Sequence, residues 1–535
     1  MNPRRRYRGP GAKAGRISGR SGLFGVLLAL LLLGGLLAGV ARFRTTGFDL
    51  VAAIGSFMPT PARVTVPPPS ASATPQPTQA TPTDVATWTP TPLPPSPTPT
   101  ALLTPQPTQS YTTQSGDTMA ALAARFGVNP ADIKAPGGLL GTTSLAKGQL
   151  LYIPKVLSDV VSPGYTVVPD SEVVYSATFD PVAFAAAQNG YLAHYRGFVE
   201  GLMRPGGEVI LMAAQDHSIS PRLLTALLEY ASGWVTDPNP QGDALLYPMG
   251  YVHPYLRELS AQLNWATTQL AVGYYGWRAG TVTDLTFPDG STLRLNPALN
   301  AGTVALQYFF AQSLNRPAWD QAVGDQGFAA TYRRLFGDPF AHAIDPIIPP
   351  DLTQPPLALP FEPGHTWAFT GGPHGAWEHG GARAALDFAP GAIMSGCVDS
   401  PEWVTAVAAG KIIRSDFGSV VLDLDGDGRE TTGWDILYLH VADAGRVAAG
   451  AFVEAGDLIG HPSCEGGVAT GTHVHVARKY NGEWVPADGP IPFDLSGWVA
   501  HGGPQEYQGT LTRGSQSVTA CPCTAAYTAI TADEP

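Results

Sequence analysis

The stretch THVHVARKY, residues Thr472–Tyr480, alternates histidine and valine near its start and places His473 and His475 two positions apart. Such alternation predicts a β-strand. Side chains two positions apart project from the same face of a strand, so both imidazoles are expected to enter one pocket. One strand histidine is usually structural, but a pair on one face indicates a catalytic or metal site.

The segments before this strand also have the pattern of β-structure. Strands separated by turns that contain glycine and aspartate are predicted in VTAVAAGKIIRS (residues 404–415), SVVLDLDGDG (residues 419–428) and WDILYLHVA (residues 434–442). The last of them supplies His440 on a strand near the histidine pair. We therefore expect a mainly antiparallel β domain over residues 361–500.

Zinc is the metal that these side chains favour. A catalytic zinc site has three protein ligands and one open position for water. Two histidines and one aspartate contribute a single negative charge, so the metal stays a strong Lewis acid. The upstream stretch GPHGAWEHGGARAALDFAP, residues 372–390, offers His374, His379 and Asp387 as further ligands.

With H-x-H after a glycine-rich turn and Y-x-H upstream of it, the domain resembles the lysostaphin-type (LytM/LasA-like) zinc metalloendopeptidases of bacterial cell walls. The resemblance implies that Asp387 and His475 bind one zinc ion per chain. It also implies that His440 and His473 form the catalytic pair.

The first zinc ligand depends on the branch of this family. In most members it stands in H-x-x-x-D, but here Arg383 occupies the position of that histidine. The turn GPH before LDF, and the run CEGGVATGTHVH, instead look like the LasA branch, whose first ligand stands in a G-x-H turn well before the aspartate. This resemblance implies His374 as the first ligand, with His379 as the second choice and His365 behind it.

The N-terminal residues predict a membrane anchor and a stalk. Residues 1–22 carry seven basic side chains and precede LFGVLLALLLLGGLLAGVA, residues 23–41, which has no charge. That length can cross a bilayer as one helix, and the basic flank places the tail in the cytoplasm. The rest of the chain is then expected in the cell envelope, or secreted if the helix is a cleaved signal. Residues 42–110, rich in proline and threonine, predict an extended stalk.

Residues 111–154 resemble a LysM module, a βααβ unit that binds N-acetylglucosamine-containing glycans. The resemblance rests on SGDT, ARFGV and the closing GQLLYIP. It implies that Gly116, Asp117 and Thr118 contribute to glycan binding, although a small spacer domain without a ligand is the alternative.

Residues 160–345 predict a helix-rich domain. SPRLLTALLEYASGW, residues 220–234, resembles the first helix of the lysozyme-like lytic transglycosylases, which ends in E-S-G-F. Ala231 stands where that family has its catalytic glutamate. Glu229 lies two residues earlier, about 200° away around a helix, so we expect a non-catalytic relative that holds glycan strands or serves as a spacer.

Two further features remain in the C-terminal half. DLDGDGRE, residues 423–430, resembles the start of an EF-hand loop, but the twelfth position is Trp434 rather than the glutamate that calcium needs there, so a hairpin turn is favoured. Cys397 and Cys464 both fall in the β domain and are candidates for a disulfide, as expected outside the cytoplasm. Cys521 and Cys523 lie in a C-terminal extension, residues 501–535, and are too close in sequence for a relaxed bond with each other.

Composition excludes one class of function. The net charge is −12 and 14% of residues are charged, which gives no electrostatic footprint for nucleic acid. The sequence as a whole predicts a multidomain α+β protein: a membrane-anchored zinc endopeptidase that cleaves peptidoglycan. The alternatives are a non-catalytic wall scaffold or activator of other hydrolases, and a LasA-type protease of secreted proteins.

Overall fold

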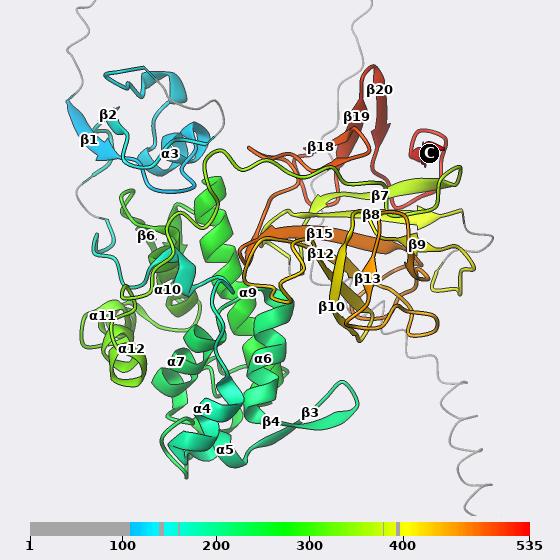
Figure 1. The fold of residues 1–535 in the computed structure, drawn as a ribbon. Coiled ribbons are helices and arrows are strands. Elements are labelled where there is room, and N and C mark those ends of the chain that lie inside the picture. The colour runs from blue at the N-terminus through cyan, green and yellow to red at the C-terminus, as the bar shows by residue number, and fades with distance from the viewer. Residues whose placement is uncertain (1–106, 139–143, 159–160, 378, 392–395, 535) are drawn as a thin grey trace, which may run out of the picture. The chain divides into compact units, whose positions relative to one another are not determined.

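The computed structural model describes residues 107–535 except 139–143, 159–160, 378, 392–395 and 535 (Figure 1). The predicted basic tail, membrane span and almost all of the stalk lie outside these residues. Within the described part of the chain, no helix has both the length and the apolar character that a membrane crossing requires.

The described chain begins with a small unit of two strands and one helix. Strands β1 (Thr108–Thr112) and β2 (Leu150–Pro154) pair antiparallel. Between them lie α3 (Met119–Phe126) and the 3-10 turn η2 (Pro130–Asp132). Helix α3 starts where Thr118 accepts a hydrogen bond from the third residue of the helix, an N-cap that satisfies one orphan amide. Glycan binding by this unit stays a prediction.

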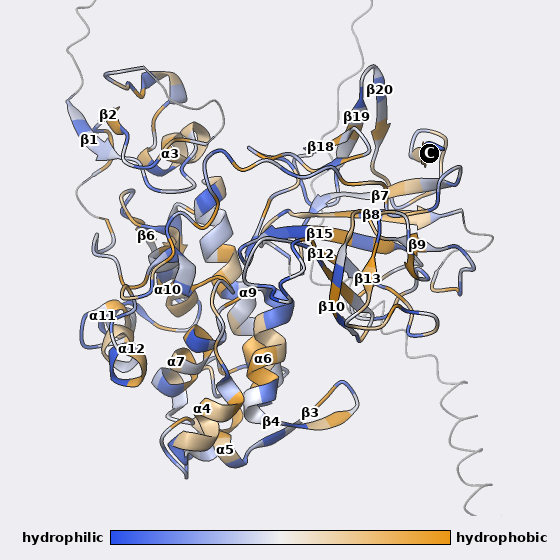
Figure 2. Ribbon diagram, viewed as in Figure 1, coloured by the Kyte–Doolittle hydropathy of each residue, from blue (hydrophilic) through white to orange (hydrophobic). Residues whose placement is uncertain are grey.

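A helical part follows, in which the long helix α9 packs against α6 and α10. Apolar residues fill the spaces between these helices, as the hydrophobic colour of α6 illustrates (Figure 2). Its elements are η3 (Asp170–Glu172), α4 (Pro181–Gln188), α5 (Tyr191–His194), β3 (Arg196–Val199), β4 (Leu202–Pro205), α6 (Gly206–His217), α7 (Pro221–Ser232), α8 (Asp243–Leu246), α9 (Glu258–Ala279), β5 (Asp284–Thr286), β6 (Thr292–Arg294), α10 (Ala301–Ala311), α11 (Arg316–Val323) and α12 (Phe328–Phe336).

The C-terminal part is built on a nine-stranded sheet with the order β13-β10-β11-β12-β15-β8-β7-β21, to which β16 adds beside β15. Its neighbouring strands pair antiparallel, which confirms the predicted combination of helices with an antiparallel C-terminal sheet in an α+β chain. The strands are β7 (Thr366–His374), β8 (Ala385–Pro390), β10 (Gly410–Asp416), β11 (Ser419–Asp423), β12 (Trp434–Leu439), β13 (Phe452–Val453), β15 (Val474–Tyr480), β16 (Glu483–Trp484) and β21 (Ala529–Thr531).

Two smaller sheets complete this part. One joins β9 (Val404–Thr405) to β14 (Leu458–Gly460); the other has the order β17-β18-β19-β20. The latter strands are β17 (Asp494–Leu495), β18 (Trp498–Gly502), β19 (Gly509–Arg513) and β20 (Gln516–Thr519). The boundary predicted after residue 500 thus falls inside β18, and the predicted extension supplies β21 to the main sheet. Local patterns do not show such a return of the chain to a distant strand.

One face of the main sheet carries three rows of side chains in register, and we call it the helix-facing side. The middle row shares one apolar core with the helical part, so the helices cover this face. The opposite face packs into a second core with residues such as Leu422, Ile436 and Val476. The rows are Ser419–Leu439–His475–Asp387, Val421–Leu437–Ala477–Ala385 and Asp423–Asp435–Lys479.

In the helical part, Glu229 has a structural contact set. Its carboxylate is buried and accepts hydrogen bonds from the backbone of Val235 and Thr236, at 3.1 Å each, and from the Thr236 hydroxyl at 2.6 Å. Arg334 donates a further hydrogen bond at 2.7 Å. These contacts hold the turn that follows α7, where Gly233 adopts the left-handed conformation.

The change Glu229→Gln is expected to lower the free energy of unfolding by about 2 kcal/mol, because an amide replaces a buried charged acceptor and turns two donors toward other donors. Arg334 adds little, since its side chain is 53% exposed. Urea unfolding of the purified chain measures the change. Any hydrolysis of peptidoglycan, measured per folded molecule, should stay the same. If that hydrolysis were lost while the stability stayed unchanged, Glu229 would be catalytic.

Candidate metal centre

Three strands bring His374, Asp387 and His475 together on the helix-facing side of the sheet. His374 ends β7, and Asp387 in β8 lies directly opposite His475 in β15. The Nε2 atom of His374 is 3.0 Å from the Nδ1 atom of His475. The Oδ1 atom of Asp387 is 3.2 Å from each of these nitrogens. The structure thus brings together the three residues that the sequence resemblance implied as zinc ligands.

The glycines before His374 explain how β7 reaches this position. The register of β7 against β8 shifts twice between Phe369 and His374, so the strand bends here. A Cβ atom on Gly371 would overlap the Asp387 carboxylate. A side chain at that position would therefore displace the carboxylate from the two histidines.

The outer ring nitrogens fix the tautomers of both histidines. His374 Nδ1–H donates to the Gly372 carbonyl at 2.8 Å, and His475 Nε2–H donates to the Ala376 carbonyl at 2.9 Å. The neutral rings therefore turn lone pairs inward, toward Asp387 Oδ1, a buried atom without a hydrogen-bond partner among the described residues. When both rings are neutral, these three acceptors about 3 Å apart form a site for a cation.

The geometry and chemistry of these atoms fit zinc. With metal–ligand distances of about 2.0–2.1 Å, tetrahedral ligands are about 3.3 Å apart, close to the separations found here. Burial opposes ionisation of Asp387, but in the metal-free protein the charge and hydrogen bond of a protonated His374, with a hydrogen bond from His475, hold its pKa well below the usual range. Burial also lowers the pKa of His475, which favours the neutral form that binds a metal.

The two predicted catalytic histidines lie beside the cluster. Their rings are 4.5 Å apart, centroid to centroid, and the His473 Nε2 atom is 3.8 Å from Asp387 Oδ1. His440 Nδ1–H donates to the Glu465 carbonyl at 2.8 Å, and His473 Nδ1–H donates to the Gly471 carbonyl at 2.7 Å. Each ring therefore keeps a lone pair on Nε2.

The setting of His440 keeps it uncharged. Burial, together with the neighbouring histidines His473 and His475, lowers the pKa of His440 to about 3. Its backbone φ of 65° is in the left-handed region, which few residues other than glycine adopt. The ring is therefore uncharged at neutral pH, and the lone pair on its Nε2 atom can accept a hydrogen bond.

The other candidate ligands lie apart from the cluster. His379 is largely exposed and bonds Glu506 at 3.1 Å, while His365 bonds Glu402 at 2.6 Å. Arg383 donates to a backbone carbonyl of the C-terminal region. Neither histidine has an atom in the three-residue group that could hold a metal with Asp387.

The three predicted glycan residues also have structural contacts, although Gly116 is exposed. The Asp117 carboxylate bonds Arg125 and the hydroxyl of Tyr111, both at 2.7 Å, and is buried. A Cβ atom on Gly116 would overlap the guanidinium of Arg278 from α9. Thr118 is the N-cap of α3.

Tyr507 is a site residue that sequence reasoning missed. Its ring stacks on His374, with centroids 4.1 Å apart and planes at 22°. Its backbone also bridges to Gly372, which holds the bent end of β7. Tyr507 follows the ligands in a predicted extension, and no spacing motif pointed to it.

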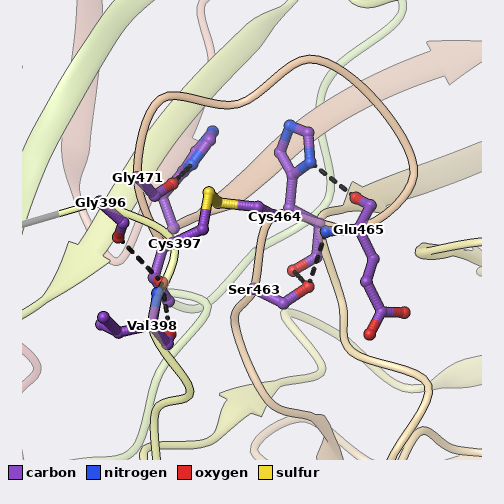
Figure 3. The surroundings of a disulfide bond; sticks show 10 residues. Gly396, Cys397, Val398, Ser463, Cys464, Glu465 and Gly471 are labelled. Atoms are coloured by element: carbon purple, nitrogen blue, oxygen red, sulfur yellow. Dashed lines mark hydrogen bonds between the residues drawn. A yellow bond between two sulfur atoms is a disulfide. The ribbon is translucent and has the colours of Figure 1, made fainter. Parts of the chain in front are cut away.

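A disulfide between Cys397 and Cys464 joins two loops whose neighbouring residues contact the predicted catalytic pair (Figure 3). Cys397 and Cys464 are joined, with Cα atoms 5.8 Å apart. Residue 465, next to Cys464, supplies the carbonyl that holds His440. The Thr472 hydroxyl, next to His473, accepts from the Val398 amide at 2.9 Å. Cys521 and Cys523 are also joined to each other.

A cavity of about 420 Å³ adjoins the loop that holds His440. The helical part and the β10–β11 turn form it together, and its lining includes Glu200, Asp216, Trp377, Arg414, Phe417 and Glu465. The hydrophobic tip of the β3–β4 hairpin carries Phe198 and Met203, both exposed (Figure 2). A cavity of this size is in the range of pockets that hold small ligands.

Comparison with known proteins identifies relatives of both large parts. The family model described as "LasA, N-terminal domain" matches residues 166–349. Protease LasA of Pseudomonas aeruginosa (strain UCBPP-PA14) is 27% identical over 300 residues, which cover 51% of this chain and 66% of LasA. The beta-lytic metalloendopeptidase of Achromobacter lyticus is 31% identical over 152 residues, 26% of this chain and 37% of that protein. The chain thus spans less than two thirds of either relative.

Solved structures were also compared. The M23 metalloprotease pseudoalterin aligns with a TM-score of 0.26 and 23% identity, over 32% of this chain and 96% of that structure. The catalytic domain of lysostaphin from Staphylococcus simulans aligns with a TM-score of 0.17 and 23% identity, over 23% of this chain and 89% of that structure.

The sequence matches, together with the buried His–Asp–His cluster on an antiparallel sheet, support a metallopeptidase of the lysostaphin-type (M23) family. Within that class the similarity is to the LasA proteases, whose N-terminal domain model matches the helical part. The resemblance of that part to a lysozyme-like fold stays a prediction.

Proposed function

We propose that this chain is a zinc endopeptidase that hydrolyses peptide bonds of bacterial peptidoglycan. The observation that carries the proposal is the cluster of His374, Asp387 and His475, whose inward atoms lie 3.0–3.2 Å apart. The names of the relatives, a protease and a beta-lytic metalloendopeptidase, support it.

The residues of the chain divide the chemistry as follows. A zinc ion held by the three ligands would supply Lewis-acid activation of water and of the scissile carbonyl. The Nε2 atom of His473 accepts the proton that water loses and returns it to the departing amine, while the uncharged ring of His440 beside it accepts a hydrogen bond through Nε2 and orients the reacting groups. Carbonyls on Nδ1 hold both rings in the required tautomer. Burial of the cluster limits access of bulk water.

We further propose that the protein is a single-pass membrane protein with its enzyme in the cell envelope. The proposal depends on residues 23–41 and the stalk, which lie outside the described residues. Glycan binding by residues 111–154 is proposed as the second contact with the wall.

The full-length chain, purified and supplied with one equivalent of zinc, tests the enzyme proposal on isolated peptidoglycan and on a glycine-rich protein. We expect new amino termini from peptidoglycan, loss of the activity with 1,10-phenanthroline and recovery with added zinc. A protein that binds zinc but releases no amino termini from either substrate would contradict an enzymatic function. Release from the glycine-rich protein alone would instead indicate a protease of secreted proteins.

A further inference from the structure

The hairpin between β11 and β12 holds a second group of acidic side chains, far along the sheet from the histidines. Carboxylate oxygens of Asp423, Asp425 and Asp427 all lie within 4.8 Å of one another. Asp423 is fully buried, and its carboxylate accepts hydrogen bonds from three backbone amides of the loop. By themselves, these contacts describe only a well-ordered turn.

Asp435 makes this group unusual. Its side chain is 0% exposed, and neither carboxylate oxygen has a hydrogen-bond partner among the described residues. A buried carboxylate without a partner is strongly unfavourable, so such groups are normally paired, bound to a metal or neutralised by a proton. Burial accordingly raises the pKa of Asp435 well above its ordinary value, and the nearby carboxylates add to this.

The strand register directs Asp435 toward the loop. Asp435 lies directly opposite Asp423, so both side chains project from the helix-facing side. The Leu424 amide donates to the Trp434 carbonyl at 3.0 Å, which continues the pairing and sets Asp425 opposite Gly433. A Cβ atom on Gly433 would overlap the Asp425 carboxylate, so that carboxylate lies over the glycine, two residues before Asp435 in the chain.

The nearby cations have other contacts. Lys479 lies opposite Asp435, but its ammonium group bonds Glu430 at 2.6 Å. Glu430 also pairs with Arg414 at 3.1 Å. Lys411, opposite Asp423, places its ammonium group near Gly428 of the loop and over the ring of Phe452, 5.9 Å from the centroid, and it forms no ion pair with the described aspartates. The four aspartates therefore retain excess negative charge.

We propose that Asp423, Asp425, Asp427 and Asp435 form a second metal site that binds a hard divalent cation, with calcium as the preferred ion. An all-oxygen set of carboxylates suits calcium and suits zinc poorly. The loop does not match an EF-hand, because Trp434 stands at the twelfth position, where an EF-hand has a glutamate. In this hairpin the further acid comes one residue later and reaches the loop across a strand pair, so the helical spacing does not apply.

The site would act on the catalytic strand. Asp435 is the second residue of β12, and His440 follows the end of the same strand. Along β12, the row that contains Asp435 and the row that contains His475 are four residues apart, which corresponds to a distance of about 14 Å. A cation that joins β11 to β12 would therefore stabilise the strand that positions His440 without contact with the substrate.

Calcium binding can be measured on the purified, zinc-loaded full-length chain. We expect 1 mM calcium to raise the unfolding temperature by about 5 °C. We also expect terbium to bind in place of calcium and to emit when Trp434, beside Asp435, is excited. Asp435→Asn should lose both responses, while its unfolding temperature without calcium should equal or exceed that of the wild type, because an unpaired buried acid is removed.

Two controls separate this site from the histidine cluster. Asp351→Asn removes an exposed aspartate elsewhere and should keep both calcium responses. His475→Ala should also keep them, since it changes only the other site. The metal site is rejected if calcium leaves the unfolding temperature unchanged and added terbium gives no emission. It is also rejected if Asp435→Asn binds calcium as the wild type does, and Asp435 is then a neutral acid.

Discussion

Replacement of His475 by alanine should remove the bound zinc and lower peptidoglycan hydrolysis by about a thousandfold or more. The His475 Nδ1 atom is one of three inward acceptors, and the metal loses both a ligand and the geometry of the other two. Loss of activation by the metal raises the activation free energy by several kcal/mol, which corresponds to a rate lower by about a thousandfold. Zinc content per chain and the release of amino termini measure the two effects.

His379→Ala is the matched control, because this histidine is 79% exposed and its ring bonds Glu506 rather than the metal cluster. Zinc content and hydrolysis should both stay near wild type. If His379→Ala lost zinc while His475→Ala kept it, the assignment of the ligands would be wrong.

The second large effect is expected from removal of the Cys397–Cys464 disulfide. Changing both cysteines to serine should lower the free energy of unfolding by about 4 kcal/mol, because the bond closes a long loop in the unfolded chain. The two cysteines are 67 residues apart. Hydrolysis should also fall, since the loops beside this bond hold His440 and His473 through their neighbours. Denaturant unfolding and the rate per zinc-loaded molecule report these separately.

The pair Cys521 and Cys523 provides the control for this change. Its double serine variant opens a link between residues only two apart, so the stability of the chain should change little. Equal losses of stability in the two double variants would contradict a loop-length effect and would indicate general damage from serine.

Local patterns in the sequence were sufficient for the parts of the site that lie on one strand. The period of two in H-x-H placed His473 and His475 on one face, and the structure has both beside the same aspartate. His374 required a resemblance to the LasA branch, because the bend that brings it to Asp387 arises from two register shifts in β7. The overlap of a Gly371 side chain with Asp387 is visible only after folding.

Contacts between distant segments could not be predicted. Tyr507 stacks on His374 only because the C-terminal residues return to β7. Asp435 looked like an ordinary strand residue, and its burial without a partner depends on pairing across the hairpin. Neither feature leaves a periodic signal, since each depends on the order of strands in the sheet.

The apolar core shared by the helices and the sheet has a consequence for protein engineering. A truncated fragment that starts at Phe361 would leave Val421, Leu437, Ala477 and Trp484 uncovered, all of which the helical part now buries. Such a fragment would be prone to aggregate, however intact its histidines were. A minimal fragment of this chain that keeps the metal centre would therefore need polar replacements at these positions, or would have to retain the helices that cover them.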